Sequence, residues 1–236
     1  FLNFYSEVEC SPSRGALTTG RHPIRNGLYN ITLPGETGSG LPAEEVTVAE
    51  ILSDVGYYTG HFGKWHMGGD EQHFPTNQGF DEAEWSEGNP PWWVNNKHAS
   101  ASDDIGGMTN RALVHSPGPE NFPYDTEGVM RARKGEKPEM VYEYSMEKYN
   151  TYDSEVADLV IEFIKRRAET DKPFFVNFWG KGNHFWGAHP DFRDTPAGTN
   201  TSAQMVEHDY NVGRILKTLK DLGMAETTLV IWASDH

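Results

Sequence analysis

The stretch VADLVIEFIKRRAETDKPFFVNFW, residues 156–179, decides the fold class of this chain. Its first half has the periodicity of one helix face, with apolar residues at i, i+3, i+4, i+7 and i+8: Val156, Leu159, Val160, Phe163 and Ile164. We expect Asp153 or Ser154 to cap the start of this helix, and Pro173 to end it. Residues 174–179 then form a short apolar run that is typical of a buried strand.

The same alternation of helix and strand occurs on both sides of this stretch. Upstream, the pattern predicts a helix over about 47–55 and a strand over 57–62. Downstream, it predicts a strand over 227–233 and, before it, a second amphipathic helix that stops at Gly223. The apolar face of that helix consists of Val212, Ile215, Leu216, Leu219 and Leu222. Helices that alternate with buried strands imply crossover connections, so we expect an α/β fold with a largely parallel central sheet flanked by helices on both faces.

Charge and composition exclude several classes of function. The chain has 20 basic and 35 acidic residues and a formal net charge of −15, which disfavours a nucleic-acid or anionic-membrane surface. No run approaches the roughly 18 apolar residues that a membrane span needs. The single Cys rules out an intramolecular disulfide framework. Because the chain as a whole is negatively charged, local cations must bind any anionic substrate.

Polar side chains follow three of the predicted strands. Lys64 and His66 follow the first, His184 follows the second, and Asp235 and His236 follow the third. In open parallel sheets, ligands bind just beyond the carboxyl ends of the strands. The sequence therefore predicts one site at this rim of the sheet.

The segment CSPSRGALTTG, residues 10–20, adds a candidate nucleophile. Cys10 precedes a proline, Pro12, that suits the first turn of a helix. A helix N-terminus stabilises anions through its free N–H groups, and Arg14 adds a cation one turn later. A lone Cys is more often a buried structural residue, and on these grounds alone that interpretation stays open.

Four motifs together resemble the formylglycine-dependent sulfatase family of arylsulfatase type. Residues 10–20 resemble its C-x-P-S-R signature, except that Thr18 stands where an apolar residue is usual, a position we attribute to helix packing. GKWHMG at 63–68 resembles G-K-W-H-L-G, and the end of the chain, 234–236, resembles the start of S-D-[HN]-G. PTNQGFD at 75–81 is similar to a P-x-x-x-G-F-D element that we interpret as structural. The resemblance implies an alkaline-phosphatase-like fold, with 1–236 as part of one sulfatase catalytic domain.

The resemblance assigns the nucleophile and its neighbours. Cys10 is expected to be oxidised to formylglycine by a formylglycine-generating enzyme, with Cys10, Pro12 and Arg14 as the recognition residues. Lys64 is expected to bind the sulfate and the nucleophile. His66 is expected to act as a base or hydrogen-bond partner of formylglycine.

It also assigns an acid and a metal site. His184 is expected near the leaving-group oxygen, with His189 as its rival and a surface-loop histidine as the plainer reading. Asp235 and His236, together with the side chain at Cys10, are expected to bind a divalent cation, Ca²⁺ with Mg²⁺ as the alternative. A carboxylate is the more typical Ca²⁺ ligand, so Asp235 is the stronger candidate of the two.

These roles imply a hydrolysis of sulfate esters. A hydroxyl of hydrated formylglycine attacks sulfur while the metal, Arg14 and Lys64 hold the sulfate oxygens. His184 protonates the departing alcohol, and His66 later takes a proton so that sulfate leaves and the aldehyde is restored. A phosphonate monoester or phosphodiester hydrolase of the same superfamily and a non-catalytic remnant are the alternatives.

Other expectations concern the substrate and the extent of the chain. Residues 84–150, rich in Gly, Pro, Asn and aromatic residues, predict an irregular insert near the substrate pocket. In it, Trp92 and Trp93 either stack on a sugar ring of a sulfated carbohydrate or pack as a loop on the core. The family's paired aspartates and a downstream Lys fall outside 1–236, so this piece alone is expected to bind metal poorly and to turn over nothing. The resemblance favours a periplasmic or secreted protein.

Overall fold

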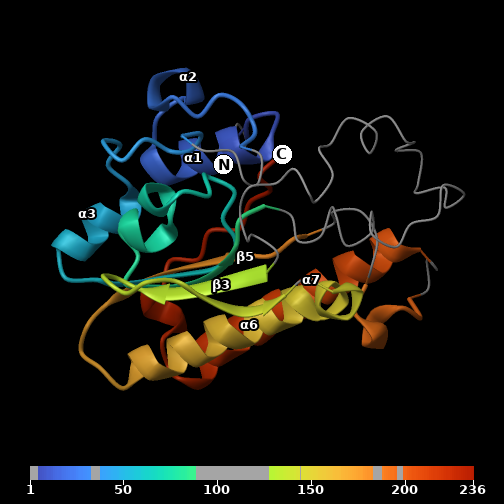
Figure 1. Cartoon of the computed structure of the whole chain (residues 1–236). Helices are drawn as coiled ribbons and strands as arrows, with labels where there is room; N and C mark the ends of the chain where they lie inside the picture. Colours follow the sequence, from blue (N-terminus) through green and yellow to red (C-terminus); the bar gives the residue numbers. More distant parts are fainter. Residues whose placement is uncertain (1–4, 33–37, 89–127, 144, 183–187, 196–198) are drawn as a thin grey trace, which may run out of the picture.

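A five-stranded sheet forms the centre of the molecule (Figure 1). The computed structural model describes residues 5–32, 38–88, 128–143, 145–182, 188–195 and 199–236. The sheet has the order β4-β3-β2-β1-β5. Its strands are β1 (Tyr58–Lys64), β2 (Glu82–Ser86), β3 (Gly128–Arg133), β4 (Glu139–Glu143) and β5 (Phe174–Trp179).

The α/β class predicted from the sequence is confirmed, with a sheet that is mixed. β1 runs parallel to both of its neighbours, β2 and β5, whereas β3 pairs antiparallel with β2 and with β4. β3 and β4 come from 84–150, where the sequence pattern had indicated only an irregular insert. Their weak periodicity has a physical reason, because β4 is an edge strand and one face of β3 carries charge, with Arg131 paired to Glu84 of β2.

Helices cover both faces of the sheet. α6 (Met146–Ala168) and α7 (Asn200–Asp221) pack together beneath it, and α1 (Cys10–Thr19), α2 (Pro23–Asn26) and α3 (Val48–Asp54) lie on the opposite side (Figure 1). Four short 3₁₀ turns complete the described elements: Glu71–His73, Pro75–Asn77, Pro190–Phe192 and Ala225–Thr227. Among the described helices, none is both long and apolar enough to cross a membrane.

Two apolar clusters fill the layers between sheet and helices. The cluster on the α1–α3 side consists of Leu28, Leu41, Ala49, Trp65, Met67, Phe80, Ala83, Trp85 and Ala132. The cluster on the α6–α7 side consists of Phe62, Val129, Tyr152, Val156, Val160, Phe163, Ile164 and Leu219. Adjacent residues of a strand point to opposite faces, so Phe62 of β1 belongs to the α6 side, while His61 contacts Trp65 and Phe80 on the other.

The start of α6 differs from the sequence prediction. Ser145, and neither Asp153 nor Ser154, is the N-cap, since its side chain accepts a hydrogen bond from the backbone N–H of Lys148. Asp153 is instead an interior residue of α6 whose buried carboxylate accepts hydrogen bonds from the backbone N–H groups of Lys181 and Gly182. Residue types that cap helices also make buried polar contacts, and local sequence does not separate the two uses.

The predictions for the last two strands had opposite outcomes. β5 forms at the predicted residues, 174–179. The strand predicted at 227–233 is wrong for this structure, because no described strand pairs with this segment. Its apolar side chains are exposed to solvent: 86% for Leu229, 51% for Val230, 75% for Ile231 and 69% for Trp232. A strand forms only where a partner supplies the ladder of hydrogen bonds, which an apolar run by itself does not specify.

Candidate active site

Cys10 is the first residue of α1 and is buried, with 4% of its surface exposed. The side chain of Glu9, the N-cap residue, makes no capping hydrogen bond with the first turn of α1. Pro12 lies in this first turn, as predicted. Thr18 is buried, which agrees with a packing role for its unusual residue type.

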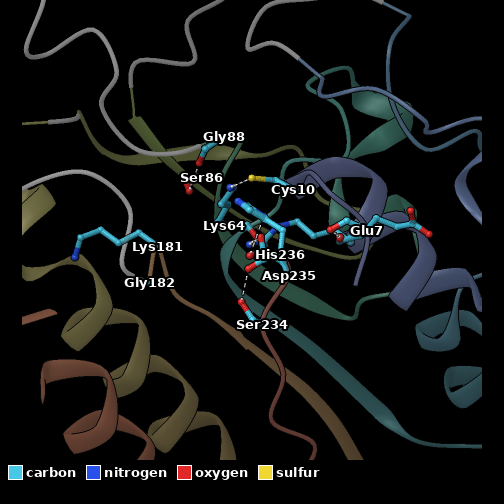
Figure 2. Close-up of polar contacts among 12 residues, drawn as sticks. Glu7, Cys10, Lys64, Ser86, Gly88, Lys181, Gly182, Ser234, Asp235 and His236 are labelled. Atoms are coloured by element: carbon cyan, nitrogen blue, oxygen red, sulfur yellow. Dashed lines mark hydrogen bonds and ion pairs between the residues drawn. The ribbon is translucent and has the colours of Figure 1, made fainter. Parts of the chain in front are cut away.

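Lys64 binds the side chain of Cys10 directly. Its Nζ donates a hydrogen bond to Cys10 Sγ at 2.9 Å, across 54 residues of sequence (Figure 2). Lys64 is the last residue of β1 and is 2% exposed. Burial first, and then the charge of Arg14, lower the pKa of Lys64 to about 8, while Cys10 opposes this shift. Lys64 is therefore placed to bind the group that the side chain at position 10 carries.

Arg14 joins α1 to two of the three segments that the sequence predicted to converge, those of Lys64 and Asp235. One terminal nitrogen, Nη1, donates to the carbonyl oxygen of Lys64 at 2.8 Å, and the other, Nη2, donates to Asp235 Oδ2 at 2.7 Å. Burial alone would raise the pKa of Asp235, but the charges of Arg14 and Lys64 outweigh it and hold that pKa below its usual range. Asp235 is therefore a carboxylate at neutral pH.

His66 lies beside this group in a strained backbone conformation. Its φ is 60°, a value that non-glycine residues seldom adopt outside functional or turn positions. The ring is buried, with Nε2 at 3.0 Å from the carbonyl oxygen of Thr32. The backbone N–H of Thr32 in turn bonds to Ser11 Oγ, next to Cys10. These contacts place His66 one hydrogen-bonded residue away from the start of α1.

Cys10, Asp235 and His236 bring three potential ligand atoms within 4.8 Å of one another. The carboxylate of Asp235 suits a divalent cation of the Ca²⁺ or Mg²⁺ type, which prefers oxygen ligands. A sulfur and an imidazole are less typical ligands of such a cation, and His236 Nδ1 lies 3.3 Å from Asp235 Oδ1. These residues therefore fit part of a metal site, with Asp235 as the one typical ligand among them.

Of the two candidate general acids, the structure describes only His189, because His184 lies outside the described residues. His189, its rival, is the N-cap of the 3₁₀ turn Pro190–Phe192, and its Nδ1 accepts a hydrogen bond from the backbone N–H of Asp191. The backbone N–H of His189 also donates to buried Glu207 at 3.3 Å. Both the ring and the backbone of His189 thus make structural contacts.

Trp179 contacts a residue of this region although the sequence analysis did not select it, whereas nearby Lys181 does not. The ring of Trp179, the last residue of β5, lies 4.9 Å from the guanidinium carbon of Arg14. Its position at the end of a predicted strand was the available signal, but the apolar run by itself predicts only a buried strand. Lys181 is buried beside Asp153, and its side chain points away from Cys10 (Figure 2).

Comparison with known proteins identifies the family. The family model described as Sulfatase matches residues 1–236. The chain is 33% identical to N-acetylgalactosamine-6-sulfatase of Canis lupus familiaris over 250 residues and 32% identical to arylsulfatase A of Homo sapiens over 247. Both alignments cover 100% of this chain, and they cover 42% and 44% of those relatives, so the chain spans less than half of their length. The crystal structure of the PsFucS1 sulfatase from Pseudoalteromonas sp. matches with a TM-score of 0.77 and 30% identity, over 93% of this chain and 44% of that one. The chain belongs to the sulfatase family.

Proposed function

We propose that the protein to which these residues belong hydrolyses sulfate esters with a nucleophile derived from Cys10. The observation that carries this proposal is the 2.9 Å contact between Lys64 Nζ and Cys10 Sγ, next to a second buried cation, Arg14. In a chain of net charge −15, two buried cations beside one cysteine at a helix N-terminus make a local site for an anion. Membership of the sulfatase family agrees with this chemistry.

The residues around Cys10 have distinct proposed roles. A formylglycine at this position supplies, as its hydrate, the hydroxyl that attacks sulfur. Lys64 orients that hydroxyl, because its ammonium group already binds the side-chain atom at this position. Arg14 neutralises sulfate charge that develops in the transition state, and its two hydrogen bonds anchor the terminal nitrogens of its guanidinium.

Proton transfer is assigned to two histidines. His66 is buried, with its backbone bonded to Glu87 and its ring to Thr32, so its orientation is fixed before substrate binds. It would accept the proton that accompanies sulfate release. His184 would protonate the leaving alcohol, a role that rests on the family motif alone.

Membership of the sulfatase family implies a divalent metal ion in general, and we propose Ca²⁺ here. Asp235 would bind it, because its lowered pKa keeps the carboxylate charged. The ion would supply positive charge to the sulfate oxygens. Position 10 and His236 lie near enough to contribute.

The proposed substrate is a sulfated carbohydrate. The support is that the relative from dog, 33% identical, is named N-acetylgalactosamine-6-sulfatase, after a sulfated amino sugar. Trp92 and Trp93, the proposed stacking residues, lie outside the described residues. The formylglycine-generating enzyme is the proposed partner during maturation.

The test uses the full-length protein produced together with a formylglycine-generating enzyme. We expect it to release sulfate from an aryl sulfate and from N-acetylgalactosamine 6-sulfate, and to cleave an aryl phosphodiester more slowly. Faster cleavage of the phosphodiester would instead favour the phosphodiesterase alternative. No turnover of either substrate class, with formylglycine present and Ca²⁺ supplied, would refute the proposal.

Cys10→Ala is expected to abolish turnover, by at least about 10³-fold, because it removes the nucleophile. Leu17→Ala is the matched control on the same helix, since Leu17 is 52% exposed and should leave the rate unchanged. Thermal unfolding of both variants checks that the fold is intact. Retained turnover in Cys10→Ala would remove Cys10 from the site.

A further inference from the structure

The side chain of Arg14 is buried, and its hydrogen bonds alone do not fix the orientation of its guanidinium group. Its side chain is 8% exposed. Two of its nitrogens bond to the carbonyl of Lys64 and to Asp235, whereas the third, Nε, has no hydrogen-bond partner among the described residues. Both bonded nitrogens lie at the terminal end of the guanidinium. Contact along its flat face is therefore needed to fix its tilt.

The ring of Trp179 supplies that contact. The guanidinium carbon of Arg14 lies over the ring at 4.9 Å from its centroid, well within the range of a cation–π interaction. An arginine removed from water loses hydration on its faces, and an aromatic face partly replaces it. Such a contact is stronger in a buried site than at an exposed surface.

The indole of Trp179 is itself fixed by its neighbours. Trp65 stacks on it, with ring centroids 6.2 Å apart and planes at 20°. His61 meets it at a right angle, with centroids 5.0 Å apart. Trp65 and His61 are fully buried. Trp65 and His61 therefore hold the indole of Trp179 in place, and Arg14 lies over its ring.

The backbone beside Trp179 also requires a glycine at position 63. Gly63 of β1 pairs with Trp179, and a Cβ added to Gly63 would come within 1.9 Å of the carbonyl oxygen of Trp179. The absence of a side chain at Gly63 lets the two strands approach at the position that precedes Lys64. The strand pairing thus fixes Trp179 and Lys64 relative to each other.

The charge state of His61 is compatible with this arrangement. Burial, together with the charge of Arg14, lowers the pKa of His61 to about 3. His61 is therefore neutral at neutral pH and adds no second positive charge facing Arg14. A neutral ring at this position supports the indole without repelling the cation above it.

We propose that Trp179 is a positioning residue that sets the orientation of Arg14 through the face of its indole, with Trp65 and His61 holding the ring. This inference rests on the proposed function for the role of Arg14 in binding sulfate. It concerns a residue that acts through Arg14 and need not touch the substrate itself.

The test replaces Trp179 by tryptophans with one, two, three and four ring fluorines, incorporated at this site in the full-length protein. Fluorine withdraws electron density from the ring face and changes its volume little, so a cation–π contact should weaken stepwise. We expect kcat/KM for an aryl sulfate to fall with each fluorine, by roughly 2- to 30-fold over the series. The inhibition constant for inorganic sulfate should rise in parallel.

Trp85 is the matched control. It is 1% exposed and packs against Phe74, and no described cation lies over its ring. The same series at Trp85 should leave both constants unchanged. A purely structural role for Trp179 predicts shifts in melting temperature without a graded change in either constant, and that outcome would overturn the proposal.

The outcome is separable from the fate of the proposed function. If the unsubstituted protein hydrolyses no sulfate ester, the proposed function fails, and calorimetric binding of inorganic sulfate across the Trp179 series still tests the contact. Graded weakening of sulfate binding would support the proposal in that case. Equal sulfate affinity across the series would contradict it.

Discussion

β1 and β5 are neighbours in the sheet, yet they contribute to the site in different ways. β1 pairs on both edges, and every residue after Tyr58 is buried, through Lys64 and on to Met67. β5 is half-buried throughout and, among the described strands, pairs only with β1. The site residues of β1 are thus held in place by burial along the whole strand. The residues at the end of β5 are held by individual contacts, such as those of Trp179 and Asp153. The predictions below test this difference, from the largest expected effect to the smallest.

Asp153→Ala should have the largest effect, because it removes the principal contact that α6 makes with the end of β5. The carboxylate of Asp153 accepts hydrogen bonds from two backbone N–H groups and lies 3.8 Å from the buried Nζ of Lys181. Its loss leaves a buried cation without its partner, which costs roughly 3–5 kcal/mol. Chemical denaturation measures this free energy of unfolding.

Asp158→Ala on the same helix is the control, since Asp158 makes an exposed ion pair with Arg214. It should change stability by less than about 1 kcal/mol. Equal losses of stability in the two variants would show that the buried contact of Asp153 contributes no more than an exposed ion pair.

Gly63→Ala tests the close approach of the two strands. Gly63 has a φ of 113°, and an added Cβ would collide with the backbone of Trp179. We expect a loss of roughly 3 kcal/mol in stability and a fall in turnover, because Lys64 follows directly. Gly213→Ala in α7, where a Cβ meets nothing within 4 Å, should instead stabilise the protein by about 0.5–1 kcal/mol. Unchanged stability in Gly63→Ala would contradict the strand geometry.

His61→Met tests the buried histidine between the strands. The pKa of His61 falls from 6.5 to about 3 on folding, so the unfolded state binds the extra proton in that pH window. Stability should therefore fall as pH decreases from 6.5 toward 3, by about 2 kcal/mol at pH 5 for this group. His61→Met should lose that much less between pH 7 and pH 5. Parallel pH profiles of unfolding for the two proteins would show that His61 is not responsible.

The smallest effect is expected in the segment beyond the sheet. Leu229 is 86% exposed, so Leu229→Ser in residues 1–236 should change the free energy of unfolding by no more than about 0.5 kcal/mol. Val160→Ala, in the apolar cluster under β1, is the buried comparison and should cost roughly 2 kcal/mol. Similar costs at both positions would mean that Leu229 is packed in solution.

How far the sequence alone predicted the molecule depends on the range of the interactions involved. The convergence of Lys64 and Asp235 was predicted from strand ends, although the strand expected before Asp235 is not formed among the described residues. Cys10 and Arg14 were joined to them only by the family resemblance. β5 was located correctly because an apolar run after Pro173 is also a local signal. What depends on a distant partner was missed.

Three features illustrate that limit. The segment at 227–233 has a strand pattern without a described partner strand. Asp153 has the residue type of a cap but serves a buried contact with the end of β5. Trp179 was placed in a strand correctly, yet its contact with Arg14 joins residues 165 positions apart, which no local pattern indicates.

The most direct test of the central claim is peptide mass spectrometry of the segment that contains Cys10, from full-length protein produced with a formylglycine-generating enzyme. The account predicts that the thiol of Cys10 is replaced by an aldehyde, and that the modified fraction of the protein matches the fraction that is active in sulfate release. A fully active protein in which Cys10 keeps its thiol would contradict the account.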